Sequence, residues 1–206
     1  MSRLLEQLNR ENMRLGAVVL CGGMARRMGG QDKGLVLLGG KPMAKWVLDV
    51  IRPQVHDLVI NANRNTESYA ALNTNVVQDE HTGYAGPLAG LSAAMQNLGT
   101  DFTFMCPCDS PFINGSIVES LGLAVLQHSA DVAVATDGER MQPVFCVVHK
   151  RVLPSLNAYL DSGERKIDRW FARCNTVEVN CSDFSASFRN INTEEERALA
   201  EQELLT

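Results

Sequence analysis

Long apolar runs are missing from this sequence. No window approaches the roughly 18 uninterrupted apolar residues that a membrane-spanning helix needs. The first residues, MSRLLEQLNRENMRLG, carry charges throughout and lack the apolar segment and small-residue cleavage site of a secretion signal. These absences predict a cytoplasmic protein without a membrane partner.

An excess of positive charge is missing too. The chain has 19 lysine and arginine residues against 24 aspartate and glutamate residues, and its formal net charge is -5. General nucleic-acid binders usually carry a basic face, so this balance argues against a nucleic-acid partner. An anionic ligand must therefore be held by a local group of cations.

Cysteines are few, and no secretion signal accompanies them, so we expect reduced thiols and no disulfide framework. They are Cys21, Cys106, Cys108, Cys146, Cys174 and Cys181. Cys106 and Cys108 form a C-x-C pair, but no second Cys/His pair at zinc-site spacing goes with it. We expect these two thiols to pack the end of a strand beside Asp109.

The apolar segments that are present are short, several are rich in valine, and they alternate little with polar residues, which is typical of strands buried on both faces. They lie at residues 17–21, 58–62, 102–106, 132–136 and 144–148. Helical patterns cover 42–51, 87–98, 115–127 and 151–160. Thr193 and Glu196 form a capping box that opens a last helix to about residue 204.

This alternation of strands and helices predicts a three-layer α/β fold, Rossmann-like, with a mostly parallel sheet. The chain has 206 residues, of which 45% are apolar, and this is enough for one core. We expect residues 16–206 to form a single domain. Residues 1–15 form an extension, either an additional amphipathic helix or a frayed arm.

The segment VVLCGGMARRMGGQDKG, residues 18–34, follows the first strand and combines five glycines with Arg26, Arg27 and Lys33. In open α/β sheets ligands bind beyond the carboxyl ends of the strands. Glycines let the backbone N–H groups approach phosphate oxygens, and the three cations add charge. The segment therefore predicts a polyphosphate site. The plainer alternative is a glycine-rich turn with solvated arginines.

Two common phosphate-binding motifs do not fit this segment. A dinucleotide fold requires G-x-G-x-x-G, whereas the glycines here are adjacent and two arginines stand where a helix would begin. A Walker A loop requires G-x-x-x-x-G-K-[ST], but Lys41 is followed by Pro42. The sequence thus disfavours an NAD enzyme and a P-loop kinase or GTPase.

The segment LCGGMARRMGGQDKG resembles the L-A-G-G-x-x-x-R-M-G-x-D-K signature of the nucleotidyltransferases, most closely that of the molybdenum cofactor guanylyltransferases. Further motifs follow in the order that this resemblance implies: GGKP, NANR, GPLAGL, FMCPCDSPF, DGERMQP and NINTEEE. The resemblance covers about residues 16–205. Cys21 departs from it by replacing the usual alanine, and the N-terminal extension falls outside it.

The resemblance implies a nucleotidyltransferase fold and transfer of GMP from GTP to the terminal phosphate of molybdopterin, with release of pyrophosphate. Asp109 follows the apolar strand 102–106 and is the expected magnesium ligand. Lys33 and Arg27 are expected at the triphosphate, and these three residues are the catalytic candidates. The attacking phosphate has a second pKa near 6, so no general base is required.

The resemblance also implies a guanine nucleotide pocket, in which Asp79 could accept hydrogen bonds from guanine and Asn61 could donate and accept them. The implied GTP-binding residues are Leu20, Cys21, Gly22, Gly23, Lys33, Asn61, Asp79 and Asp109. The alternative is that Asn61 holds a turn at a strand end and Asp79 caps a loop.

On the pterin side, the resemblance implies a second half of the cleft lined by Gly86, Gly90, Arg140, Asn190 and Asn192. The glycines would allow close approach at a helix start, or they would serve tight helix packing. Arg140 could instead be a solvated side chain, and the asparagines could shape a helix entry.

Two other functions remain open on the sequence. One is cytidylyl transfer, or transfer to a sugar phosphate or polyol phosphate, on the same fold. The other is a non-catalytic GTP-binding regulator or cofactor chaperone. The expected partners of the enzyme are GTP and the molybdenum cofactor, with transient contacts to molybdopterin-inserting proteins and to molybdoenzyme chaperones.

Overall fold

The computed structural model describes residues 2–22, 32–80 and 86–204. The strands are β1 (Leu15–Leu20), β2 (Leu37–Leu38), β3 (Lys41–Pro42), β4 (Asp57–Asn61), β5 (Asn75–Val77), β6 (Phe102–Pro107), β7 (Val132–Thr136), β8 (Met141–His149) and β9 (Thr176–Asn180). The α-helices are α1 (Arg3–Arg10), α2 (Met43–Ile51), α3 (Thr66–Ala70), α4 (Pro87–Leu98), α5 (Ser116–Gln127), α6 (Leu153–Asp161), α7 (Ile167–Phe171) and α8 (Glu194–Leu204). Short 3₁₀ helices are η1 (Lys33–Leu35), η2 (Arg52–Gln54), η3 (Lys150–Val152) and η4 (Ser182–Phe188).

Seven strands form one sheet in the order β5-β4-β1-β6-β8-β7-β9, and β2 pairs with β3 in a separate small ribbon. β8 runs antiparallel to both of its neighbours, β6 and β7, whereas the other pairings of the large sheet are parallel. The predicted mostly parallel sheet is confirmed, and it is a mixed sheet.

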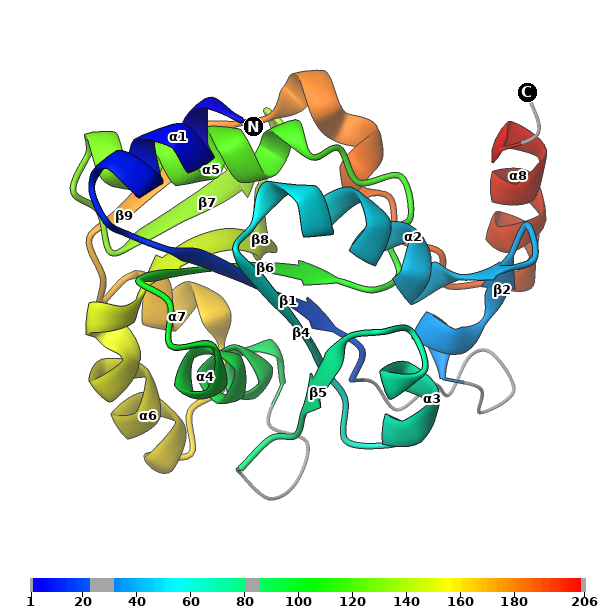
Figure 1. Cartoon of the computed structure of the whole chain (residues 1–206), viewed down its shortest axis with the longest axis horizontal. Coiled ribbons are helices and arrows are strands. Elements are labelled where there is room, and N and C mark those ends of the chain that lie inside the picture. Colours follow the sequence, from blue (N-terminus) through cyan, green and yellow to red (C-terminus); the bar gives the residue numbers. More distant parts are fainter. Residues whose placement is uncertain (1, 23–31, 81–85, 205–206) are drawn as a thin grey trace.

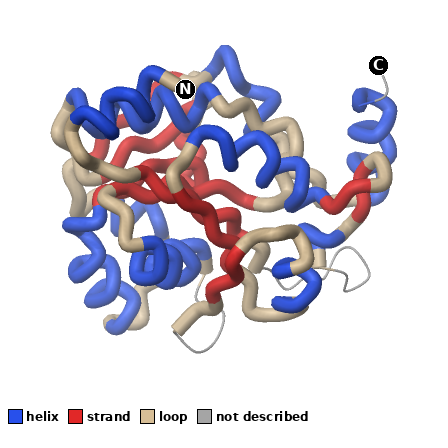
Figure 2. The backbone as a smooth tube through the Cα atoms, in the orientation of Figure 1, coloured by secondary structure: helices blue, strands red, loops and turns tan. Residues whose placement is uncertain are grey.

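Helices cover both faces of this sheet, as Figure 2 shows, with α1, α2 and α5 on one side and α4, α6 and α7 on the other (Figure 1). Successive residues of a strand face opposite layers. In β1, Ala17 and Val19 pack with α2 and α5, whereas Val18 packs with α4. The predicted three-layer α/β architecture is therefore confirmed, and each layer has its own apolar core.

All five predicted strands are present: β7 has the predicted bounds, and the ends of the other four lie within three residues of the prediction. The prediction missed β5 and β9, the two edge strands of the large sheet. β5 has three residues, and the sequence of β9, TVEVN, alternates between apolar and polar residues. Neither shows the continuous apolar run that indicates a strand buried on both faces.

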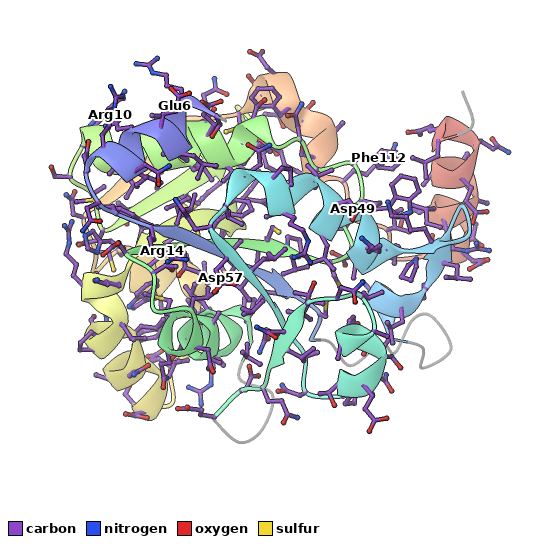
Figure 3. All side chains as sticks on the ribbon, viewed as in Figure 1. Glu6, Arg10, Arg14, Asp49, Asp57 and Phe112 are labelled. Atoms are coloured by element: carbon purple, nitrogen blue, oxygen red, sulfur yellow. The ribbon has the colours of Figure 1, made fainter. Side chains whose placement is uncertain are left out.

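Residues 3–10 of the N-terminal extension form the helix α1, which is the first of the two alternatives predicted for this extension. Leu4, Leu5 and Leu8 are buried in the layer of α5, whereas Glu6 and Arg10 point away from the body of the molecule (Figure 3). Gly122 in α5 makes room for this contact, since a Cβ there would lie 2.3 Å from Leu4 Cδ2. No helix in the described ranges combines the length and apolarity required to cross a bilayer.

A third, smaller apolar cluster joins α8 to α2 and β2. It contains Leu38, Met43 and Ile191, with Phe112 packed against it between α2 and α8 (Figure 3). The predicted capping box at the start of α8 is confirmed, because Thr193 Oγ1 accepts from Glu196 N at 3.2 Å and Glu196 Oε2 accepts from Thr193 N at 3.0 Å. This cluster holds the C-terminal segment beside the carboxyl end of β6.

Candidate functional site

Three parallel strands end together at one edge of the sheet. Leu20 of β1 lies opposite Asn61 of β4 and Pro107 of β6 in the register. Two hydrogen bonds extend this alignment past the strands: Cys21 N donates to Asn61 O at 2.8 Å, and Cys108 N donates to Leu20 O at 3.0 Å. The residues that follow these strands are therefore gathered at the edge where a ligand is expected.

Lys33 and Asp109 meet at this edge. Lys33 begins η1, and its Nζ lies 3.1 Å from Asp109 Oδ2. The same Nζ donates to Asn192 Oδ1 at 2.5 Å. The side chains of Lys33 and Asp109 are 28% and 14% exposed, so solvent screens the pair only in part. One cation thus contacts a residue predicted as a metal ligand and a residue predicted for the pterin side.

The segment 190–192 is hydrogen bonded to the loop that follows β6. Ser110 Oγ donates to Asn190 Oδ1 at 2.7 Å, and Ile191 N donates to Asp109 O at 2.9 Å. Glu196 Oε2 also accepts from Asn192 N at 2.6 Å, in addition to its bond within the capping box. The N-terminus of α8 therefore fixes the backbone from which Asn192 reaches Lys33.

An amide network occupies the end of β4. Asn61 is buried, and its Nδ2 donates to Asp79 Oδ1 at 2.9 Å and to Val77 O at 3.3 Å. Asn63 Nδ2 donates to Asp79 Oδ2 at 2.8 Å, and Asn63 Oδ1 accepts from Asp79 N at 2.8 Å. A carboxylate has about four acceptor positions, so two amide donors leave capacity for the N–H groups of a base. Asn61 and Asp79, both predicted for guanine, are in direct contact.

The sequence of this chain is similar to those of known proteins. Residues 17–177 match the family described as MobA-like NTP transferase domain. The molybdenum cofactor guanylyltransferase of Shewanella sediminis (strain HAW-EB3) is 45% identical over 186 residues, which cover 90% of this chain and 95% of that protein. The protein of the same name from Shewanella woodyi (strain ATCC 51908 / MS32) is 46% identical over 186 residues, covering 90% of this chain and 95% of that protein.

The chain belongs to the MobA-like NTP transferase family. The resemblance inferred from the motifs is therefore confirmed.

Solved structures show the same fold at low sequence identity. The molybdopterin-guanine dinucleotide biosynthesis protein A from Archaeoglobus fulgidus superposes with a TM-score of 0.78 at 24% identity, over 92% of this chain and 98% of that chain. The 4-diphosphocytidyl-2C-methyl-D-erythritol synthase from Anaerococcus prevotii DSM 20548 superposes with a TM-score of 0.71 at 13% identity, over 95% of this chain and 98% of that chain. The predicted nucleotidyltransferase-type fold is confirmed.

Gly23, expected among the GTP-binding residues, and Arg27, expected at the triphosphate, lie outside the described residues, as does Arg26. Gly22 lies inside them, and Asn61 Oδ1 is 4.0 Å from the place where a Cβ on Gly22 would stand. This part of the predicted triphosphate site stays a prediction.

The cysteines at this edge are small packing groups. Cys21 and Cys108 are both buried, and hydrogen bonding to Cys21, together with burial, raises the pKa of the Cys108 thiol well above its ordinary value. Burial raises the pKa of Cys106 in the same way. The thiols of Cys106 and Cys108 remain neutral at physiological pH, so they add no negative charge beside a polyphosphate.

Gly90 is the point where α4 meets the guanine side of the site. A Cβ there would lie 2.3 Å from Asn61 Oδ1 and 2.7 Å from Leu20 Cδ2, so any larger residue requires these side chains to move. The resemblance placed Gly90 with the pterin residues Asn190 and Asn192. The structure sets it against Asn61 and Leu20, and its place on the pterin side stays a prediction.

Replacing Gly90 with alanine is expected to weaken GTP binding about tenfold, because the added methyl group displaces the Asn61 amide and a lost hydrogen bond costs about 1.5 kcal/mol. Overpacking costs about 1–3 kcal/mol, which outweighs the gain of about 1 kcal/mol from the higher helix propensity of alanine. Calorimetric titration with GTP and thermal unfolding measure the two effects.

Gly122→Ala is the matched control for this prediction. Its Cβ meets Leu4 at the same 2.3 Å, but on α5 and away from Asn61. We expect it to lower the melting temperature and to leave GTP affinity unchanged. Equal GTP affinity of the two variants would contradict a role of Gly90 in shaping the nucleotide site.

The remaining residues expected on the pterin side are spread more widely. Gly86 caps the N-terminus of α4 with a φ of 72°, a backbone conformation that favours glycine. Apart from its chain neighbours, no described residue lies within 4 Å of the place where a Cβ would stand. Arg140 lies in the turn between β7 and β8, where its side chain is 81% exposed and pairs with Asp137 at 3.5 Å. Within the described residues, the hydrogen bonds and ion pairs do not connect Arg140 to Asp109.

Sequence reasoning missed three side chains that support the site. Asn63 shares the NANR motif with Asn61, and its spacing of two residues could have indicated that both side chains face the same side of the chain. Glu196 was predicted only as half of a capping box. Tyr69, which hydrogen bonds to Asp32, lies in a short helix that carries no motif.

Proposed function

We propose that this chain transfers GMP from GTP to the terminal phosphate of the molybdenum cofactor, which yields pyrophosphate and the guanine dinucleotide form of the cofactor. The observation that carries the proposal is the pairing of Lys33 with Asp109 at 3.1 Å, at the sheet edge that also holds the Asn61–Asp79 network. The names of the relatives, at 45% identity, support guanine as the base. Residues 16–206 are proposed to act as one nucleotidyltransferase domain.

The residues at this edge fit a magnesium ion. Asp109 offers hard carboxylate oxygens, the donors that Mg²⁺ prefers. In the described part of the chain, no cluster of three or more His, Cys, Asp or Glu side chains could hold a metal. A single aspartate is sufficient, since Mg²⁺ usually completes its shell with water and substrate phosphates. The ion would neutralise negative charge on the triphosphate.

The chain's own residues position the reactants. Lys33 would attract the triphosphate, and a cation about 4 Å from a phosphate oxygen contributes roughly 4 kcal/mol at an effective dielectric near 20, before desolvation. Asp79 and Asn61 would bind the base and thereby place the α-phosphorus near Lys33. Rate acceleration in this chemistry comes mainly from such positioning and from charge neutralisation.

The chemical step requires no basic side chain. An oxygen of the cofactor's terminal phosphate attacks the α-phosphorus of GTP, the bond to the bridging oxygen of the β-phosphate breaks, and pyrophosphate leaves with that electron pair. A phosphate monoester has a second pKa near 6, so at neutral pH the nucleophile is already largely deprotonated.

The pterin half of the cleft is proposed to begin at Asn190 and Asn192. Asn192 contacts Lys33 directly, which supports a place for the second substrate beside the triphosphate. Gly86 and Arg140 would contribute from α4 and from the β7–β8 turn. We further propose a cytoplasmic enzyme that meets molybdopterin-inserting proteins and molybdoenzyme chaperones transiently.

The deciding experiment supplies purified molybdenum cofactor and Mg²⁺ with each of the four nucleoside triphosphates and measures pyrophosphate release. We expect release with GTP, and we expect GTP to raise the melting temperature more than the other three nucleotides do. Release with CTP alone would instead indicate a cytidylyltransferase. GTP binding without pyrophosphate release would indicate a non-catalytic GTP-binding protein.

A further inference from the structure

Tyr69 is buried, and it contacts the residues on either side of Lys33 in the chain. It belongs to α3, and its side chain is 0% exposed. Its hydroxyl donates to Asp32 Oδ1 at 2.5 Å, across 37 residues of sequence. Asn65, just before α3, donates from Nδ2 to the other carboxylate oxygen of Asp32 at 3.3 Å. Both oxygens of Asp32 are therefore held by the same short element.

Asp32 is the residue directly before Lys33, and its backbone starts η1. Its carbonyl oxygen accepts from Leu35 N at 2.9 Å, so side chain and main chain are both constrained. A lysine side chain has many rotamers, so its Nζ can take many orientations. A fixed Cα at Lys33 reduces the number of orientations that reach Asp109.

Gly34 shows how closely Tyr69 approaches this segment. A Cβ on Gly34 would lie 2.5 Å from the Tyr69 hydroxyl oxygen and 3.2 Å from Cys108 Sγ. Gly34 therefore lies against both Tyr69 and Cys108, and a larger residue at this position would collide with the tyrosine hydroxyl. Burial, as the largest cause, raises the pKa of Tyr69 far above its ordinary value, so the hydroxyl remains a donor at physiological pH.

We propose that Tyr69 is a positioning residue, which through its hydrogen bond to Asp32 holds Lys33 in place to reach Asp109 and the triphosphate. The inference rests on the proposed function for the role of Lys33. The contact between Tyr69 and Asp32 itself belongs to the structure and can be tested without the reaction.

The first test replaces Tyr69 with phenylalanine, which removes only the hydroxyl group. We expect kcat to fall about 10- to 100-fold, since a misplacement of about 1 Å has an effect of this size. Tyr159→Phe is the matched control. Tyr159 is also buried, and its hydroxyl donates to Lys166 O at 2.8 Å, within the region of α6 and α7.

Each of the two variants loses one hydrogen bond, and both are expected to melt about 2–4 °C lower than the parent protein. Only Tyr69→Phe is expected to lose kcat. Equal kcat values for the two variants would show that the Tyr69 hydroxyl supports the fold alone, and the proposal would be overturned.

The second test is a double-mutant cycle with Asp32. Asp32→Ala and Tyr69→Phe remove the same hydrogen bond, so the double variant should be no slower than Asp32→Ala. Asp32→Asn keeps an oxygen acceptor for the tyrosine and is expected to retain most of the kcat of the parent. Losses that multiply in the double variant, or an Asp32→Asn variant as slow as Asp32→Ala, would contradict the proposal.

A crystal structure of Tyr69→Phe separates this inference from the proposed function. We expect Lys33 Nζ to leave Asp109 or to lose its defined position. If Lys33 stays on Asp109 as in the parent protein, the inference is wrong, whatever the reaction is. If the parent protein releases no pyrophosphate and Lys33 still moves in the variant, the proposed function fails while the positioning role stands.

Discussion

Exchanging Asp109 for asparagine is expected to slow pyrophosphate release by about 10³-fold or more, because roughly 4 kcal/mol of attraction between one cation and one carboxylate is lost at an effective dielectric near 20. Asparagine keeps the size of the side chain. The hydrogen bond from Ile191 N goes to the backbone oxygen of Asp109 and is unaffected. The protein should therefore remain folded but lose the carboxylate that is proposed to bind the magnesium ion. Initial rates at saturating GTP and Mg²⁺, together with the melting temperature, measure this.

Asp57→Asn is the matched control for this change. Asp57 begins β4 and so lies at the opposite end of the strand from Asn61, near the N-terminal ends of the parallel strands (Figure 3). We expect its activity to equal that of the parent protein. If a folded Asp109→Asn variant keeps its activity, the carboxylate has no role in the reaction. The pairing of Lys33 with Asp109 would then no longer support the proposed function.

Replacing Lys33 with methionine is expected to lower kcat/KM for GTP by about 10²- to 10³-fold, since methionine keeps the length of the stem but loses the charge that attracts the triphosphate. Asp109, only 14% exposed, also loses a cation partner. Lys33→Arg should restore part of the activity, because it returns the charge but presents a planar fork in place of a compact ammonium group. Steady-state kinetics over a range of GTP concentrations measures both variants.

Lys150→Met tests whether the loss is specific to the site. Lys150 forms an ion pair of 2.6 Å with Asp101, and its side chain is 56% exposed. Surface pairs of this kind contribute about 0–1 kcal/mol, so we expect unchanged kinetics and a small change in stability. If Lys33→Met were no slower than Lys150→Met, the triphosphate would have to be held by residues other than Lys33.

The parts of the fold that sequence analysis predicted are those that depend on neighbouring residues. An apolar run is required wherever a strand is covered on both faces, and the five interior runs were readable for this reason. The glycine-rich segment that contains Lys33 comes after β1, and Asp109 comes after β6. Because the carboxyl ends of parallel strands share an edge, the meeting of Lys33 and Asp109 follows from topology.

The edge strands and the antiparallel course of β8 could not be predicted in the same way. β9 is paired on one side only, so its sequence is not required to be apolar throughout. The direction of β8 depends on a tight connection after β7, and the apolar pattern of a buried strand is the same in either direction.

The sequence by itself determined the chemistry of this protein: a glycine-rich segment with Lys33, an aspartate at a strand end, and motifs whose order indicates the family. Only the tertiary structure decided which side chains hold those groups in place. Tyr69 forms a hydrogen bond with Asp32, and the Asn61 amide lies against Gly90, because helices α3 and α4 pack against particular strands. Such contacts depend on how distant elements fit together, and neighbouring residues in the chain carry no pattern that indicates them.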